Sequence, residues 1–280
     1  MPTPITPAGR EGLAAIADCP DRAFLAFDFD GVLSPIVEDP EKAQAFPRAF
    51  HALAEIGKMV GSVAIITGRP VSFVTSRDGF GTLLALPDFT VYGQYGREKW
   101  DAASRSTVSA PPDQGIEAIR QELARLLEQP GAHQGSWLED KGSAVAVHTR
   151  RAADPAQALA ALSGPVREIA DRHHLRVEPG KMVLEIRPPG VHKGDVLRAA
   201  VRDHTARAVL YAGDDLGDLS AFATVDELRR DGIPGVKVCS GSPEAPEVAE
   251  AADIVVDGPA GVADLLETLT RRIEMKDPSA

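Results

Sequence analysis

Short, continuous apolar runs recur along the chain and are not interrupted by alternating polar positions. Strands that are buried on both faces have this pattern. Segments of helical character lie between most of the runs, as at residues 47–58 and 70–77, and a helix between two strands permits parallel pairing through a crossover. The pattern predicts a doubly wound α/β core with a mostly parallel sheet. The predicted strands are 24–27, 63–66, 89–92, 208–212, 236–238 and 254–256.

Residues 106–187 interrupt this rhythm. A linker-like Ser-Ala-Pro-Pro segment precedes a region in which strand candidates follow one another across short turns. Such runs are typical of an antiparallel sheet with helices on one face. We therefore expect residues 1–105 and 188–280 to form the core and residues 106–187 to form an inserted α+β domain. Its predicted elements are helices 114–129 and 155–173 and strands 137–141, 144–150, 175–178 and 182–187.

Composition narrows the class of protein. The chain has 280 residues, 44% hydrophobic, which suffices for one large domain and a smaller one. Its formal charge of −11 argues against partners such as nucleic acid or an anionic membrane. Two distant cysteines, Cys19 and Cys239, imply neither a disulfide framework nor a zinc site, so free thiols are expected. Without a signal-like N-terminus or a bilayer-length apolar run, we expect a cytoplasmic protein, and a monomer.

The first predicted strand ends in Asp28-Phe29-Asp30-Gly31. In an open parallel sheet, ligands bind beyond the carboxyl ends of the strands, which is where these carboxylates fall. Two residues apart in extended chain, Asp28 and Asp30 point to the same side, about 7 Å from each other. One could then attack a substrate while the other handles a proton. Taken alone, the motif is equally typical of an ordinary turn.

Two further strand ends carry matching groups. Thr67-Gly68-Arg69 follows the second strand and could hold a phosphoryl oxygen, or simply cap a helix. Asp214, Asp215 and Asp218 follow the strand 208–212, and three carboxylates so close repel one another unless a cation is present. Magnesium takes one or two carboxylates together with waters and phosphate oxygens. Asp28 and Asp214 fit as its ligands, with Asp215 or Asp218 supporting them.

Lys193 opens a helix directly after the insertion. A lysine at the positive end of a helix dipole is unfavourable unless an anion compensates it. A solvated surface lysine is the alternative, but the nearby carboxylate motifs favour Lys193 as a partner of a phosphate or of a nucleophile.

Taken in their order along the chain, the four motifs at Asp28, Thr67, Lys193 and Asp214 resemble those of the haloacid dehalogenase superfamily of phosphatases. The resemblance implies a HAD-like, Rossmannoid core and an α/β cap. The resemblance implies that Asp28 is the nucleophile and that Asp30 is the general acid/base, with a backbone carbonyl that binds Mg²⁺. It further implies that Thr67 and Lys193 hold the transferring phosphoryl group and that Asp214 is a metal ligand.

The insertion carries a polar sheet face. In 182–187, Glu185 alternates with apolar residues, and in 144–150 His148 and Arg150 do so. Carboxylates and cations together suit a polyol, which both donates and accepts hydrogen bonds. An exposed face of solvated ion pairs is the competing interpretation. The full polar set also contains Glu139, Lys141, Glu178 and Lys181.

Segments 139–142, 148–150 and 178–188, with the extended first motif, resemble the trehalose-6-phosphate phosphatase family. The resemblance implies a sugar phosphate, trehalose 6-phosphate, as the small-molecule substrate. Lys141, Lys181 and Glu185 become the expected sugar contacts, and we also assign Arg69, Glu139, His148 and Arg150 to substrate binding. The sequence departs from the family pattern at Val32, Gly217 and Leu219. A phosphatase of another sugar phosphate, a non-catalytic sugar-phosphate sensor and a protein-binding module remain alternatives.

Overall fold

A computed structural model describes residues 5–37, 39–86, 88–111, 114–131, 133–142, 144–180, 182–188, 192–241 and 246–276. The chain divides into two compact units, Met1–Val108 with His192–Ala280 and Ser109–Val191, which we call the core and the insertion. The strand Ser106–Ser109 belongs to the core sheet, and the division between the two units falls at its last residue. None of the described helices is long and apolar enough to cross a bilayer.

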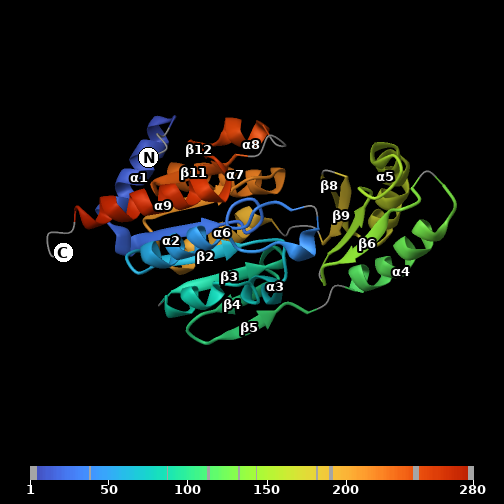
Figure 1. Cartoon of the computed structure of the whole chain (residues 1–280), viewed down its shortest axis with the longest axis horizontal. Helices are drawn as coiled ribbons and strands as arrows, with labels where there is room; N and C mark the ends of the chain where they lie inside the picture. Colours follow the sequence, from blue (N-terminus) through green and yellow to red (C-terminus); the bar gives the residue numbers. More distant parts are fainter. Residues whose placement is uncertain are drawn as a thin grey trace. The chain divides into compact units, whose positions relative to one another are not determined.

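The core contains an eight-stranded sheet in the order β12-β11-β10-β1-β2-β3-β4-β5 (Figure 1). Neighbouring strands from β12 to β3 are parallel, whereas β4 runs antiparallel to β3. This confirms the predicted mostly parallel sheet. The strands are β1 Ala23–Phe27, β2 Ser62–Ile66, β3 Phe89–Gly93, β4 Glu98–Asp101, β5 Ser106–Ser109, β10 Ala208–Gly213, β11 Gly235–Ser240 and β12 Ile254–Val256.

Helices cover both faces of this sheet because its central strands are apolar on both sides. Leu25 and Phe27 of β1 pack in one cluster with residues of α1, α2 and α9, whereas Phe24 and Ala26 pack in another with residues of α6 and α7. Cys19 is exposed and Cys239 is buried, and neither forms a disulfide bond in the part of the chain that the structure describes. The core helices are α1 Pro7–Asp18, α2 Pro47–Gly57, α3 Val71–Thr75, α6 Lys193–Asp203, α7 Leu219–Arg230, α8 Pro246–Ala251 and α9 Gly258–Glu274, with 3-10 turns η1 Pro20–Arg22, η2 Pro40–Lys42, η3 Phe80–Ala85, η4 Gln94–Gly96 and η5 Leu216–Asp218.

The insertion is a separate antiparallel sheet in the order β6-β7-β9-β8. Its helices α4 (Gln114–Glu128) and α5 (Pro155–Arg172) pack on one face, where Ile119, Val147 and Val166 share a single apolar cluster. The opposite face presents the polar side chains. The strands are β6 Trp137–Asp140, β7 Val145–His148, β8 Arg176–Gly180 and β9 Val183–Arg187.

Candidate active site

The three strand ends singled out from the sequence meet at one edge of the core sheet. Asp28 follows β1, Thr67 follows β2 and Asp214 follows β10, and these strands are parallel neighbours with β1 in the middle. All three residues are buried, with exposed fractions of 5%, 1% and 4%. The amide of Asp28 donates to the carbonyl of Ala212 at 2.9 Å, which continues the β1–β10 ladder up to the carboxylate. The polar ends of these strands therefore form one buried cluster.

Lys193, the first residue of α6, joins this cluster. Its Nζ lies 2.7 Å from Oδ2 of Asp28 and 2.7 Å from Oδ1 of Asp218, and its side chain is only 4% exposed. Burial opposes the charge of the ammonium group, but Asp218 and Asp28 hold the pKa of Lys193 well above its usual value. The lysine is therefore a buried cation shared between two carboxylates, as its place at a helix N-terminus suggested.

Asp218 is saturated with hydrogen bonds. Its Oδ1 accepts from Lys193 and from the hydroxyl of Tyr211 at 2.6 Å, and its Oδ2 accepts from the amides of Asp214 at 2.9 Å and Asp215 at 3.2 Å. Although burial raises the pKa of Asp218, Lys193 and these donors bring it below the ordinary value. The carboxylate of Asp215, which is exposed, accepts in turn from the amide of Asp218 in a capping box. Asp218 thus orients Lys193 and the backbone at Asp214.

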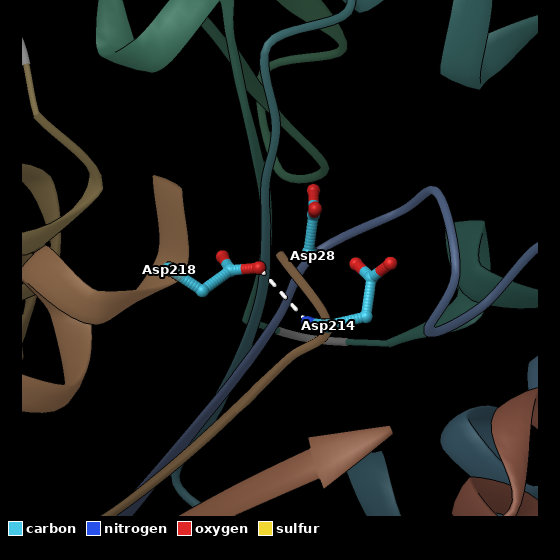
Figure 2. A group of neighbouring side chains, drawn as sticks. All are labelled: Asp28, Asp214 and Asp218. Atoms are coloured by element: carbon cyan, nitrogen blue, oxygen red, sulfur yellow. Dashed lines mark hydrogen bonds between the residues drawn. The ribbon is translucent and has the colours of Figure 1, made fainter. Parts of the chain in front are cut away.

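The carboxylates of Asp28 and Asp214 lie side by side (Figure 2), and each has a ligand oxygen within 4.8 Å of the other and of Asp218. Burial, together with the neighbouring Asp28, raises the pKa of Asp214 to about 10. Burial also raises the pKa of Asp28 well above its usual range, against the lowering effect of Lys193. No described residue donates a hydrogen bond to the carboxylate of Asp214. Two buried hard oxygen donors with one cationic neighbour fit a divalent cation such as Mg²⁺.

Gly31 and Ser240 shape the loop against these carboxylates. Gly31 has φ +70°, and a Cβ placed on it would lie 2.1 Å from Oδ2 of Asp214. Ser240, buried at the end of β11, donates its hydroxyl to the carbonyl of Gly31 at 2.6 Å. Only a glycine allows the loop after Asp30 to approach Asp214 this closely.

Replacing Gly31 by alanine should lower catalytic activity about 10²-fold, because the new methyl displaces the Asp214 carboxylate. Gly232→Ala is the matched control, since Gly232 also has a positive φ of +84° but faces open space. Both variants should lose about 1–2 kcal/mol of stability from the left-handed backbone. Phosphate release and denaturant unfolding separate the two effects, and equal activity losses in both variants would contradict the assigned contact.

Asp30, two residues after Asp28, forms a bidentate pair with Arg69. Nε of Arg69 donates to Oδ2 of Asp30 at 2.8 Å, and its NH2 donates to Oδ1 at 3.0 Å. The guanidinium lies over the ring of Phe73 at 4.3 Å. The amide of Arg69 also donates to Oγ1 of Thr67 at 3.1 Å. Arg69 therefore contacts both Asp30 and Thr67. The sequence analysis assigned Arg69 to substrate binding and did not predict these contacts.

Within the insertion, the structure pairs four of the predicted sugar-binding residues on the polar face of the sheet. Nζ of Lys141 lies 2.5 Å from Oε2 of Glu185, and Nε2 of His148 lies 2.7 Å from Oε2 of Glu139. The ring of His148 stacks on Trp137, its cross-strand partner, with centroids 4.7 Å apart. This face therefore carries both carboxylates and basic side chains.

Two other predicted substrate-binding residues, Arg150 and Lys181, are not seen on this face. Arg150 does not extend the alternation of β7, because the strand ends at His148 and Arg150 lies exposed in the following turn. Lys181 lies outside the described residues.

Sequence reasoning missed Tyr211, Ser240 and Trp137. Tyr211 sits inside an apolar run and gave no polar signal. Ser240 ends β11, two residues beyond the predicted strand 236–238 and at the same sheet edge as Asp28, so the rule that located the carboxylates could also have located it.

Comparison with known proteins shows which family the chain resembles. The model of the trehalose-phosphatase family matches residues 26–255. A trehalose-phosphate phosphatase of Mycobacterium tuberculosis (strain ATCC 25618 / H37Rv) is 33% identical over 254 residues, covering 88% of this chain and 61% of that protein. The corresponding protein of Mycobacterium leprae is 31% identical over 257 residues, covering 88% and 57%. The chain thus spans about three fifths of the length of these relatives.

Solved structures show the same fold. The C-terminal domain of a C. albicans trehalose-6-phosphate phosphatase has a TM-score of 0.74 at 22% identity, covering 96% of this chain and 98% of that one. A haloacid dehalogenase-like hydrolase from Bacteroides thetaiotaomicron has a TM-score of 0.58 at 18% identity, covering 88% and 99%. With the family model matching most of the core and all of the insertion, the chain belongs to the trehalose-phosphatase family.

Proposed function

We propose that this chain hydrolyses trehalose 6-phosphate to trehalose and phosphate, with Mg²⁺ as cofactor and Asp28 as the nucleophile. The family match over residues 26–255 supports the choice of substrate. The buried arrangement of Asp28, Lys193 and Asp214 at one sheet edge supports the chemistry.

Asp28 attacks the phosphorus atom through one carboxylate oxygen. The new bond is an aspartyl phosphate, and the bond between phosphorus and the sugar oxygen breaks. The Phe29 amide donates to Oδ1 of Asp28 at 2.7 Å, and Lys193 contacts Oδ2, so the carboxylate is held in one orientation before substrate arrives.

Asp30 moves the protons. It gives a proton to the departing sugar oxygen, and in the second step it takes one from the water that attacks the aspartyl phosphate. That attack releases phosphate and restores the carboxylate of Asp28. In the structure Arg69 donates to both oxygens of Asp30, so one of these two hydrogen bonds breaks when Asp30, carrying the proton, turns to the departing sugar oxygen.

The remaining residues stabilise the phosphoryl group. Thr67 already accepts from the Arg69 amide, so its hydroxyl proton can point to a phosphoryl oxygen. Lys193 neutralises charge on the transferring group. Asp28, Asp214 and the backbone carbonyl of Asp30 would hold Mg²⁺, which when bound supplies further charge neutralisation for the phosphoryl oxygens. Asp218 and Asp215 fix Lys193 and the Asp214 backbone.

In the insertion, the pairs Lys141–Glu185 and Glu139–His148 would contact the sugar hydroxyls, since carboxylates accept from hydroxyls and cations donate to them. We propose the same contact with the sugar for Lys181 and Arg150, on the family resemblance alone.

Phosphate release from a substrate panel tests the proposal. Trehalose 6-phosphate should have the highest kcat/KM among trehalose 6-phosphate, sucrose phosphate, a glycosyl phosphoglycerate and p-nitrophenyl phosphate. Treatment with a chelator should bring activity to background, and added Mg²⁺ should restore it. A higher kcat/KM for another sugar phosphate would move the assignment to that substrate, and unchanged release after chelation would refute the role of the metal.

A further inference from the structure

Arg120 of α4 reaches the turn between β6 and β7 in the insertion. Its NH2 donates to Oδ1 of Asp140 at 3.0 Å and to the carbonyl of Gly142 at 2.6 Å. Its NH1 pairs with Glu117, one helical turn earlier on the same helix. One guanidinium therefore contacts the residue before and the residue after Lys141.

The described residues of this turn also hydrogen-bond to one another. The amide of Gly142 donates to Oδ1 of Asp140 at 2.8 Å, and the amide of Lys141 donates to the carbonyl of Ala144 at 3.0 Å. Gly142 has a φ of +79°, a conformation that favours glycine. Arg120 and the Gly142 amide share the same oxygen of Asp140. Removing the guanidinium would leave the Gly142 carbonyl without this donor and the Asp140 carboxylate without its cation.

From this turn, Lys141 extends to Glu185 on β9, with Nζ 2.5 Å from Oε2. A lysine side chain has many rotamers, so its headgroup is placed only as well as its backbone is fixed. We propose that Arg120 is a positioning residue that fixes this turn, sets Lys141 against Glu185, and thereby contributes to selection of the sugar. This rests on the proposed function, which assigns Lys141 and Glu185 to the sugar.

A positioning role for Arg120 has different consequences from a general stabilising role in the insertion. A residue that only stabilises the fold would affect every substrate alike and would act independently of Lys141. A positioning residue acts through Lys141, so its effect should disappear once that side chain is gone. The contacts predict the second behaviour.

A double-mutant cycle with Arg120→Ala and Lys141→Ala tests this. The measured quantity is the ratio of kcat/KM for trehalose 6-phosphate to kcat/KM for p-nitrophenyl phosphate, which lacks the sugar. Arg120→Ala should lower this ratio about tenfold or more, and Lys141→Ala should lower it at least as much. The double variant should match Lys141→Ala. Arg125→Ala, an exposed arginine on the same helix, is the control and should leave the ratio unchanged.

Hydrogen exchange gives a second readout that needs no substrate. Exchange in peptides covering residues 138–142 should quicken in Arg120→Ala and not in Arg125→Ala. If Arg120→Ala does not fold, Arg120→Lys serves in both measurements, because it keeps the charge but loses the fork geometry. Multiplicative losses in the cycle, or unchanged exchange in the turn, would overturn the inference. Failure of the proposed function would instead show in the wild-type protein, as no preference for trehalose 6-phosphate.

Discussion

Asp28→Asn should lower kcat for phosphate release at least about 10³-fold, because an amide cannot attack phosphorus as a carboxylate does. The side chain keeps its shape, but its one remaining oxygen can accept from the Phe29 amide or from Lys193, not from both as the carboxylate does. Burial raises the pKa of Asp28 well above its usual range, so the uncharged amide also removes an unfavourable buried charge next to Asp214. The substitution also removes one of the two carboxylates that contact Lys193, so we expect the two effects to offset each other and the Tm of the Mg²⁺-free variant to stay close to that of the wild type.

Two measurements separate loss of the nucleophile from loss of fold. The variant should show a smaller rise in Tm with added Mg²⁺, because one of two carboxylate ligands is gone. Asp231→Asn, an exposed aspartate of the core, is the matched control and should retain full activity. Magnesium-dependent release from Asp28→Asn at the wild-type rate would refute the assignment of the nucleophile.

Lys193→Ala should have the second largest effect, on activity and on stability together. The substitution leaves Asp28 and Asp218 buried without their shared cation, which costs about 3–5 kcal/mol of unfolding free energy. Activity should fall about 10²- to 10³-fold, since a group that stabilises the transition state is lost. Denaturant unfolding and phosphate release on the same preparation give both numbers.

Lys58→Ala is the control for this substitution. Lys58 lies in the core unit with 56% of its side chain exposed, in a surface pair with Glu55. Its removal should change stability by no more than about 0.5 kcal/mol and should leave activity intact. A Lys193→Ala protein as stable as Lys58→Ala would show that the buried ion pairs are not formed in solution.

The buried cluster at the core sheet edge was largely predictable from the sequence. Apolar runs locate parallel strands, and parallel strands bring their carboxyl ends to one edge, so Asp28, Thr67 and Asp214 had to lie close together whatever the loops did. Lys193 was predictable because a cation at a helix N-terminus needs an anion.

What the sequence could not predict depends on side-chain direction. The contact of Tyr211 with Asp218 follows from the turn η5, whose geometry sends the Asp218 carboxylate back toward β10. The pairing of Arg69 with Asp30 likewise depends on rotamers. The prediction for Arg150 was wrong because it assumed that the alternation continues beyond the end of β7. The segment opposite, just before β9, bends at Met182, which has a φ of +57°.

The division of the chain has a consequence for how the family can diversify. Asp28, Thr67, Lys193, Asp214 and Asp218 all lie in the core unit, and residues 109–191 leave and re-enter it at two points. Changes in the insertion can therefore accumulate, or one insertion can replace another by recombination, without altering a single residue of the buried charge cluster. Selection on the two units can then proceed at different rates within one gene.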